Sequence, residues 1–391
     1  MRIESTNLIK NDYNFLKLLW DFSFIFWLIT ELTITHSMIA QIALALFGAI
    51  TILIIILENK IIINSIIIYY SIFIIICYLN IFLGYSINKE LSKALLSTLI
   101  KDLIFIIIFY YYITIQGIAI FKKAFIFATT TTTIILLPIT YFNTGSFILR
   151  GEESLVNPNS IAICAAFTVF WIIASGKKLK VFDCFIISIL SLFFILSGTR
   201  KAIIALIIGL IVYICLKNPK MLIRNAIIIT ISLCVLYFLM IKINFLYNSI
   251  GYRIESFIAL IQGNESDSSA ETRQHFIELG WLYFKQNPIL GFGINCFQTI
   301  PGSYGTYSHN NYIELLFSVG IIGTISYYSM HITIFIRAIK QYIKNKKNNI
   351  ILALSFITIT LTMDIAMVSY YSRSSLMYIV ICYALIERIN D

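Results

Sequence analysis

Long apolar runs separated by short polar loops constrain the fold of this chain more than any other feature. Hydrophobic residues make up 59% of the 391 residues and charged residues only 12%, about half the charged fraction of a soluble domain. A helix that crosses a bilayer needs about 20 mostly apolar residues. The chain contains twelve candidate runs: 15–34, 37–57, 61–83, 94–118, 124–142, 159–175, 181–197, 201–216, 225–246, 310–336, 350–370 and 374–387. The sequence therefore predicts an all-α, polytopic membrane bundle that forms one transmembrane domain over residues 1–391.

The basic residues of the short loops predict how the bundle is oriented. Cytoplasmic loops carry an excess of lysine and arginine. With the N-terminus inside, the more basic loops, near 122–123, 177–180, 217–224 and 337–347, are cytoplasmic. Both termini are then cytoplasmic, in agreement with an even number of helices. The net charge of +10 does not indicate a nucleic-acid partner, because the basic residues lie in these loops and form no stripe on a soluble face.

One connection, residues 247–308, is much longer than the others and is extracytoplasmic in this orientation. Loops of this length usually carry function. Its first part, 262–272, is acidic and rich in serine. Its second part, 272–285, has apolar residues at helical spacing and predicts a helix, which the Asn287–Pro288 pair ends. Residues that carry out the function are therefore expected in this loop.

Arginines on the extracytoplasmic side are candidates for binding phosphate. Arg200 lies between two runs with almost no loop, where a guanidinium is costly unless it meets water or an anion. Arg273 stands at the head of the predicted loop helix. A planar guanidinium can make paired hydrogen bonds to phosphate oxygens. The alternatives are a helix end-cap that reaches the membrane surface for Arg200 and a solvated charge for Arg273. Arg150 and Arg253 are weaker candidates for the same cavity.

His309 is the candidate for proton transfer. Of the four histidines, it alone lies within a polar run at the mouth of a predicted span, Ser308–Asn311. Histidine titrates near neutral pH, so it can act as a general base or donate a hydrogen bond to phosphate. The alternative is that His309 is only the neighbour of a helix cap, since Ser308 or Asn310 could cap the helix without it.

Asp364 falls in the middle of the 350–370 run. An acidic residue at that depth suggests function by default, because a charge in the bilayer is costly. The alternative is a structural ion pair with a nearby arginine, such as Arg373.

The sequence indicates no cofactor and no metal. Gly291 and Gly293 are not a dinucleotide fingerprint, because the third glycine and the βαβ unit are missing. The chain has no P-loop, no HExxH motif, no paired-cysteine motif, and no Asp-rich loop that would suggest a metal-bound sugar nucleotide.

Taken in order, these motifs resemble the bacterial O-antigen ligase and O-antigen polymerase (Wzy-type) superfamily. The strongest part of the resemblance runs from Thr272 to Tyr328 and includes Arg273. The motifs that carry it are Asn287–Gly293, Ser308–Leu315 and Gly320–Gly323, with Asn157–Asn159 and Ser197–Arg200 in agreement upstream.

The resemblance implies a helical membrane bundle of the GT-C type and a metal-independent glycosyltransferase. Its substrates would be oligosaccharides carried on undecaprenyl diphosphate at the outer face of the bacterial cytoplasmic (inner) membrane. Arg200 and Arg273 would hold the diphosphate of the donor, and His309 would assist the acceptor or the leaving group. Asn310 and, by position alone, Asp364 would contact the substrate.

Three functions fit these features. The favoured one is a polymerase of O-antigen or capsule repeat units, which would have membrane lipids and possibly a chain-length regulator as partners. The second is a ligase of lipopolysaccharide biosynthesis, which moves the finished glycan to lipid A–core or to a protein. The third is a flippase or transporter, which is disfavoured because the chain lacks a matching pair of interrupted helices and has one long loop.

Overall fold

A computed structural model describes residues 2–34, 37–59, 62–144, 158–176, 178–244, 247, 251–252, 255, 259 and 268–387. Arg150 and Arg253 lie outside the described residues. Within those ranges the secondary structure is helical and contains no strand. The α-helices are α1 (Arg2–Thr33), α2 (Met38–Glu58), α3 (Ser65–Phe82), α4 (Lys89–Gln116), α5 (Ile118–Thr144), α6 (Pro158–Ile173), α7 (Val181–Leu196), α8 (Arg200–Lys217), α9 (Leu222–Lys242), α12 (Ser268–Gln286), α13 (Asn311–Lys344), α14 (Asn348–Met363) and α15 (Arg373–Glu387), with short 3-10 turns η1 (Pro219–Met221) and η3 (Phe297–Thr299).

Each apolar run that was predicted to span the membrane coincides with a helix. Several ends differ from the prediction: α1 begins at Arg2, well before residue 15, α13 continues to Lys344, and α14 ends at Met363, so that Asp364 follows the helix. Among the described residues, six helices are long and apolar enough to cross a membrane: α2, α3, α4, α5, Pro219–Lys242 and α13. The apolar helices Asn159–Ile173, Val181–Leu196 and Asn348–Met363 are shorter. The fold is thus all-helical with several candidate spans.

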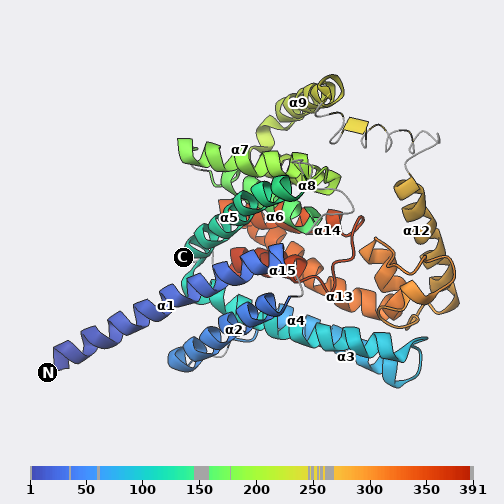
Figure 1. Cartoon of the computed structure of the whole chain (residues 1–391), viewed down its shortest axis with the longest axis horizontal. Coiled ribbons are helices and arrows are strands. Elements are labelled where there is room, and N and C mark those ends of the chain that lie inside the picture. The colour runs from blue at the N-terminus through green and yellow to red at the C-terminus, as the bar shows by residue number, and fades with distance from the viewer. Residues whose placement is uncertain are drawn as a thin grey trace. The chain divides into compact units, whose positions relative to one another are not determined.

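The chain divides into two compact units. Unit 1 comprises Met1–Ile62 and Ile108–Ala202, and unit 2 comprises Ile63–Ile107 and Ile203–Asp391. In unit 1, α1 packs on α2 and α5, and α5 also packs on α6 and α7 (Figure 1). The core of unit 1 is aromatic: the ring of Phe24 lies 4.8 Å from that of Tyr112 and 5.7 Å from that of Phe47, all fully buried. Unit 1 therefore has its own tightly packed interior.

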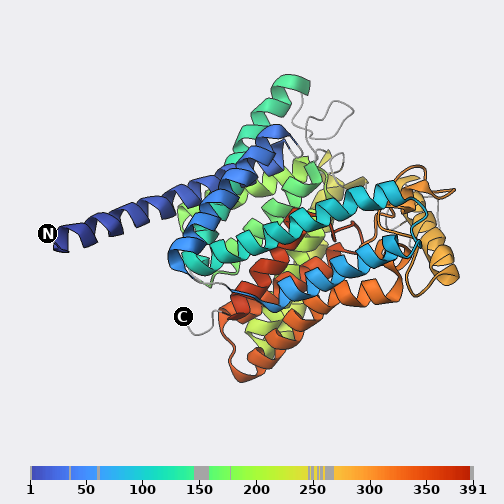
Figure 2. The ribbon, with the colours of Figure 1, turned by 90° about the horizontal axis from the view of Figure 1, so that it is seen from below.

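Helix α13 organises unit 2. It packs against α3, α12, α14 and α15. Figure 2 shows α3 running alongside α13, and Figure 1 shows α12 beside the first part of α13. The residues that precede α13 in the chain lie next to α12, so unit 2 contains the second half of the long loop together with the helices that support it.

Helix α13 is broken at Gly320, and the 287–293 segment forms hydrogen bonds with the backbone groups on both sides of the break. Gly320 has φ 61° and ψ −164°, which is not helical. The carbonyl groups of Phe317 and Ser318 accept hydrogen bonds from the amides of Phe292 and Gly293, both at 2.8 Å. The amide of Ile321 in turn donates to the carbonyl of Pro288 at 2.8 Å. Buried backbone groups that lose their helical partners need other hydrogen-bond partners, and the 287–293 segment supplies them here.

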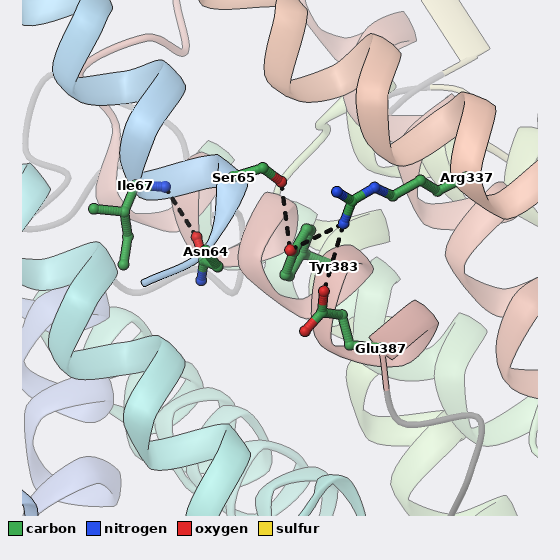
Figure 3. A network of polar contacts seen from close by, with 6 residues as sticks. All are labelled: Asn64, Ser65, Ile67, Arg337, Tyr383 and Glu387. Atoms are coloured by element: carbon green, nitrogen blue, oxygen red, sulfur yellow. Dashed lines mark hydrogen bonds and ion pairs between the residues drawn. The ribbon is translucent and has the colours of Figure 1, made fainter. Parts of the chain in front are cut away.

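A polar network joins three helices near the C-terminal end of α13 (Figure 3). Arg337 donates to the hydroxyl of Tyr383 at 3.1 Å and contacts Glu387 at 3.4 Å. The hydroxyl of Ser65 at the start of α3 donates to Tyr383 at 3.4 Å. Arg337, expected in the loop after a span, lies within α13, because that helix continues to Lys344.

Candidate functional site

Helix α12 positions Arg273. The predicted loop helix is confirmed, from Ser268 to Gln286. Phe276 is fully buried and packs its ring on Phe297, while Gly280 lies so close to Ile313 of α13 that a Cβ atom would collide with it. This close approach fixes α12 against the first turn of α13. Arg273 precedes Phe276 by three residues, on the same helical face, and is partly buried.

The polar run before α13 is held by hydrogen bonds from its own residues. Asn310 is the N-cap of α13, with its side-chain oxygen accepting from the amide of Ile313 at 3.1 Å. The carboxylate of Glu314, only 2% exposed, accepts from the amide of Ser308 at 2.9 Å. The capping alternative is therefore confirmed for Asn310, and Glu314 clamps the loop from the other side. His309 lies between these two anchored residues.

His309 adopts a backbone conformation that is uncommon for a side chain of its size. Its φ is 58°, in the left-handed region. Its ring lies 4.3 Å from that of Tyr307 and is stacked on that of Phe276 at 6.2 Å. Strained residues persist where surrounding contacts over-determine them, and they cluster at functional sites. The clamps on Ser308 and Asn310 are contacts of that kind.

Tyr307 connects His309 with Arg273. Burial raises the pKa of the Tyr307 phenol above its usual value of 10.0, while the positive charge of Arg273 lowers it. Burial and, to a smaller extent, the negative charge of Glu314 also raise the pKa of Tyr371, which lies between α14 and α15, and Glu314 acts on the pKa of Tyr307 in the same direction. Arg273 and Tyr371 thus lie near enough to Tyr307 to interact with it electrostatically, and together with His309 these residues form a group that we name the outer-loop cluster.

Asn311 ties the head of α13 to the 364–372 connection. Its side-chain oxygen accepts from the amides of Ser369 and Tyr370 at 2.9 and 3.2 Å, and its backbone amide donates to the carbonyl of Asp364 at 2.7 Å. The Asn311 side chain is fully buried. This anchoring fixes the connection that carries Tyr371 relative to His309.

For Asp364 the structural alternative, an ion pair with Arg373, is wrong, and the substrate contact stays a prediction. The carboxylate of Asp364 accepts hydrogen bonds from the hydroxyl of Tyr328 at 2.8 Å and from the side-chain nitrogen of Asn311 at 3.3 Å. Arg373, proposed above as its partner, donates instead to the fully buried Asp102 of α4 at 3.2 Å. Asp364 therefore supports the head of α13, while Arg373 joins α15 to α4.

Arg200 belongs to unit 1, where two upstream motifs meet. The hydroxyl of Thr199, next to Arg200, contacts the side-chain oxygen of Asn159 at 3.2 Å. Asn159 belongs to the first turn of α6, and Gly198, with φ 57°, turns the chain between α7 and α8. Arg200 is thus the first residue of α8 and is partly buried. Its action together with Arg273 and His309 stays a prediction.

Sequence reasoning missed two members of the outer-loop cluster and underrated a third residue that supports it. Tyr307 precedes the polar run by one residue, and this proximity was the available signal. Tyr371 lies on a connection that Asn311 anchors from a distant part of the chain, which no local pattern reveals. Glu314, which was not among the candidates drawn from the sequence, is buried and accepts a hydrogen bond from the amide of Ser308.

The chemistry available at the outer-loop cluster is ion binding and proton handling. Arg273 supplies a fixed positive charge, His309 an imidazole and Tyr307 a phenol that stays protonated at neutral pH. Within the ranges that the structure describes, no three His, Cys, Asp or Glu side chains are grouped so as to hold a metal ion. Arginine side chains bind anions and histidine side chains transfer protons in many proteins.

By class, the chain is an integral membrane protein whose polar cluster lies on a loop helix and at the head of a broken helix. Residues 185–328 match the family model described as O-antigen ligase. The match confirms the resemblance that the sequence predicted, and it supports the O-antigen ligase/polymerase family. Members of that family are glycosyltransferase-like enzymes, and their substrates are lipid-linked glycans. No curated protein matches the chain.

Proposed function

We propose that the protein is a metal-independent glycosyltransferase that polymerises O-antigen or capsule repeat units at the outer face of the cytoplasmic membrane. It would move a growing glycan from undecaprenyl diphosphate onto the non-reducing end of a second lipid-linked repeat unit. Both termini would be cytoplasmic, and the 247–308 loop would face the other side. The observation that carries this proposal is the grouping of Arg273, Tyr307 and His309 within the stretch that matches the family.

The chemistry of the proposed reaction suits these side chains. An acceptor hydroxyl attacks the anomeric carbon, the bond from that carbon to the diphosphate oxygen breaks, and the electron pair leaves with the diphosphate. Because the donor is already activated, the enzyme needs to orient the hydroxyl, take its proton and stabilise the departing charge. His309 would take the proton, and Arg273, joined by Arg200, would stabilise the diphosphate through charge-assisted hydrogen bonds.

Anchoring by buried contacts supports a site that is preorganised for this reaction. Stabilisation of developing charge is effective where the donors are fixed before the reaction begins. Gly280 fixes α12 close to α13, and the clamps on Ser308 and Asn310 fix His309. Arg273 and His309 are thus held by the same helix pair.

A ligase is the second candidate, because the matching family model is described as O-antigen ligase. The donor and the leaving group are the same in both reactions, so the outer-loop cluster would serve either one. The difference lies in the acceptor, which is lipid A–core or a protein for a ligase.

Purified protein supplied with lipid-diphosphate-linked repeat units in a metal-free buffer tests the proposal. A ladder of longer lipid-linked glycans is the expected product. Transfer that occurs only after lipid A–core is added would replace the polymerase reading with the ligase reading. Movement of the intact substrate across a vesicle membrane, without any new glycosidic bond, would overturn both readings in favour of a transporter.

A further inference from the structure

The turn before the polar run holds an aromatic side chain out into solvent. Tyr304 is 76% exposed. The amide of Thr306 donates to the carbonyl of Ser303 at 3.1 Å and closes a four-residue turn with Tyr304 and Gly305 at its centre. Ser303 is buried and donates through its hydroxyl to the carbonyl of Ile300 at 2.8 Å, so the base of the turn is anchored.

The backbone conformation of this turn disfavours tyrosine at position 304. The φ angles of Tyr304 and Gly305 are 51° and 71°. A turn with two successive positive φ angles favours Asn, Asp or Gly at the first central position, and a bulky residue there is an outlier. The turn geometry therefore does not account for Tyr304, and its ring calls for a separate explanation.

The ring of Tyr304 lies beside the outer-loop cluster. Its centroid is 5.9 Å from that of Phe276, and the His309 ring is stacked on the same Phe276 at 6.2 Å. The Tyr304 ring also lies 5.9 Å from His275, which contacts the carbonyl of Gly302 at 3.1 Å. An oligosaccharide that reacts at His309 is long enough to reach the Tyr304 ring.

We infer that Tyr304 is a sugar-binding subsite, whose ring packs against the apolar C–H face of a pyranose in the glycan that reacts at the cluster. Tyrosine presents an apolar face of large area together with a polar hydroxyl at its edge, and a pyranose presents C–H groups on its faces and hydroxyls at its rim. The inference rests on the proposed function and adds that the site recognises the glycan as well as the diphosphate. The subsite acts on binding, so its loss raises KM and leaves kcat nearly unchanged.

The test compares Tyr304→Ala, Tyr304→Phe and Tyr304→Trp with the wild-type protein. The control is Trp281→Ala, an exposed aromatic of the same loop helix whose ring pairs with Phe284. Two quantities are measured: KM and kcat for the lipid-linked repeat unit, and the Kd of the same oligosaccharide freed from its lipid. The free oligosaccharide is water-soluble, so a role of Tyr304 in anchoring the loop to a membrane surface would not change its Kd.

We expect Tyr304→Ala to raise both KM and the Kd of the free oligosaccharide about five- to tenfold, the equivalent of one lost aromatic contact. Tyr304→Phe, Tyr304→Trp and Trp281→Ala should stay near the wild type. Unchanged binding in Tyr304→Ala, or an equal loss in Tyr304→Phe or Trp281→Ala, would overturn the inference. If wild-type protein transfers glycan and Tyr304→Ala binds it equally well, the subsite alone is wrong. If wild-type protein binds the oligosaccharide through Tyr304 but transfers nothing, the proposed function is wrong and the subsite stands.

Discussion

Neighbouring residues of the Ser308–Asn311 run have separate tasks. Ser308 is held through its amide by Glu314, Asn310 caps α13, and Asn311 anchors the 364–372 connection. Only His309 projects its ring toward Tyr307 and Phe276. Asn310 was predicted both as a possible cap and as a substrate contact, and the structure confirms the first of these roles. This division of tasks is why His309 carries the proposed proton transfer.

Glu314 should act as a positioning residue for His309. Removing the acceptor in Glu314→Leu leaves the buried amide of Ser308 unsatisfied, at a cost of about 1–3 kcal/mol, so the His309 loop should lose its fixed conformation. Glu314→Gln keeps an oxygen acceptor and should retain most of the activity. Transfer rates and thermal unfolding of both variants provide the measurement, and equal rates for Gln and Leu would contradict this role.

At the scale of elements, the break in α13 explains why the Asn287–Gly293 and Gly320–Gly323 motifs both need glycine. A Cβ atom on Gly320 would collide with the backbone of Ile289, and one on Gly291 would collide with the carbonyl of Phe317 and the amide of Gly320. Both glycines have positive φ. The 287–293 segment can therefore enter the break only if both positions lack a side chain.

Gly320→Ala should prevent unit 2 from folding, because both a positive φ and a backbone collision oppose the new methyl group. Gly305→Ala is the matched control, since Gly305 has φ 71° and no atom within 4 Å of its Cβ position. The control should lose only about 1–2 kcal/mol from the left-handed conformation. Yield and monodispersity in detergent measure the difference, and similar behaviour of the two variants would contradict the account of the break.

Breaking the buried ion pair between Asp102 of α4 and Arg373 of α15 should destabilise the protein more than breaking the ion pair between Arg337 and Glu387. Asp102 is fully buried and the Arg373 side chain is 18% exposed, whereas the Arg337 and Glu387 side chains are 44% and 41% exposed. Asp102→Asn should cost about 3–5 kcal/mol by leaving a buried charge without its counterion. Glu387→Gln should cost under about 1 kcal/mol. Thermal unfolding of both variants tests the ranking, and an equal loss would contradict it.

The elements could be predicted from sequence, and the contacts between distant residues could not. Apolar runs and helical spacing are local properties, and they placed the spans and the 272–285 loop helix near their observed positions. The Arg373–Asp102 pair joins residues 271 positions apart, and no local pattern distinguishes that partner from Asp364. The approach of Tyr371 to Tyr307 depends in the same way on the Asn311 anchor. His309 and Arg273 were found because each lies inside a local motif.

At the scale of the molecule, the candidate residues are distributed over two units. Arg200 lies near the end of unit 1, next to Thr199, whose hydroxyl contacts Asn159. Arg273 and His309 belong to unit 2. The family match from 185 to 328 covers residues of both units. The proposed reaction therefore draws on residues of both units.

The orientation proposed for the membrane predicts which residues can be labelled from outside. In a cysteine-free background, Gln274→Cys on α12 should react with a membrane-impermeant maleimide in spheroplasts. Lys344→Cys at the end of α13 should react only after the membrane is opened. Both positions are exposed, so access to the reagent depends on the side of the membrane. The reverse pattern would contradict the predicted orientation.

The most direct test of the central claim is the glycan-transfer assay with Arg273→Ala and His309→Asn. Asparagine tolerates a positive φ, so His309→Asn removes the imidazole and keeps the turn, and the exposed Gln274→Ala serves as the control on α12. We expect wild-type protein and Gln274→Ala to extend the lipid-linked glycan, and each of the other variants, still folded, to be slower by about one to two decades. Wild-type rates in both Arg273→Ala and His309→Asn would contradict the assignment of the reaction to the outer-loop cluster.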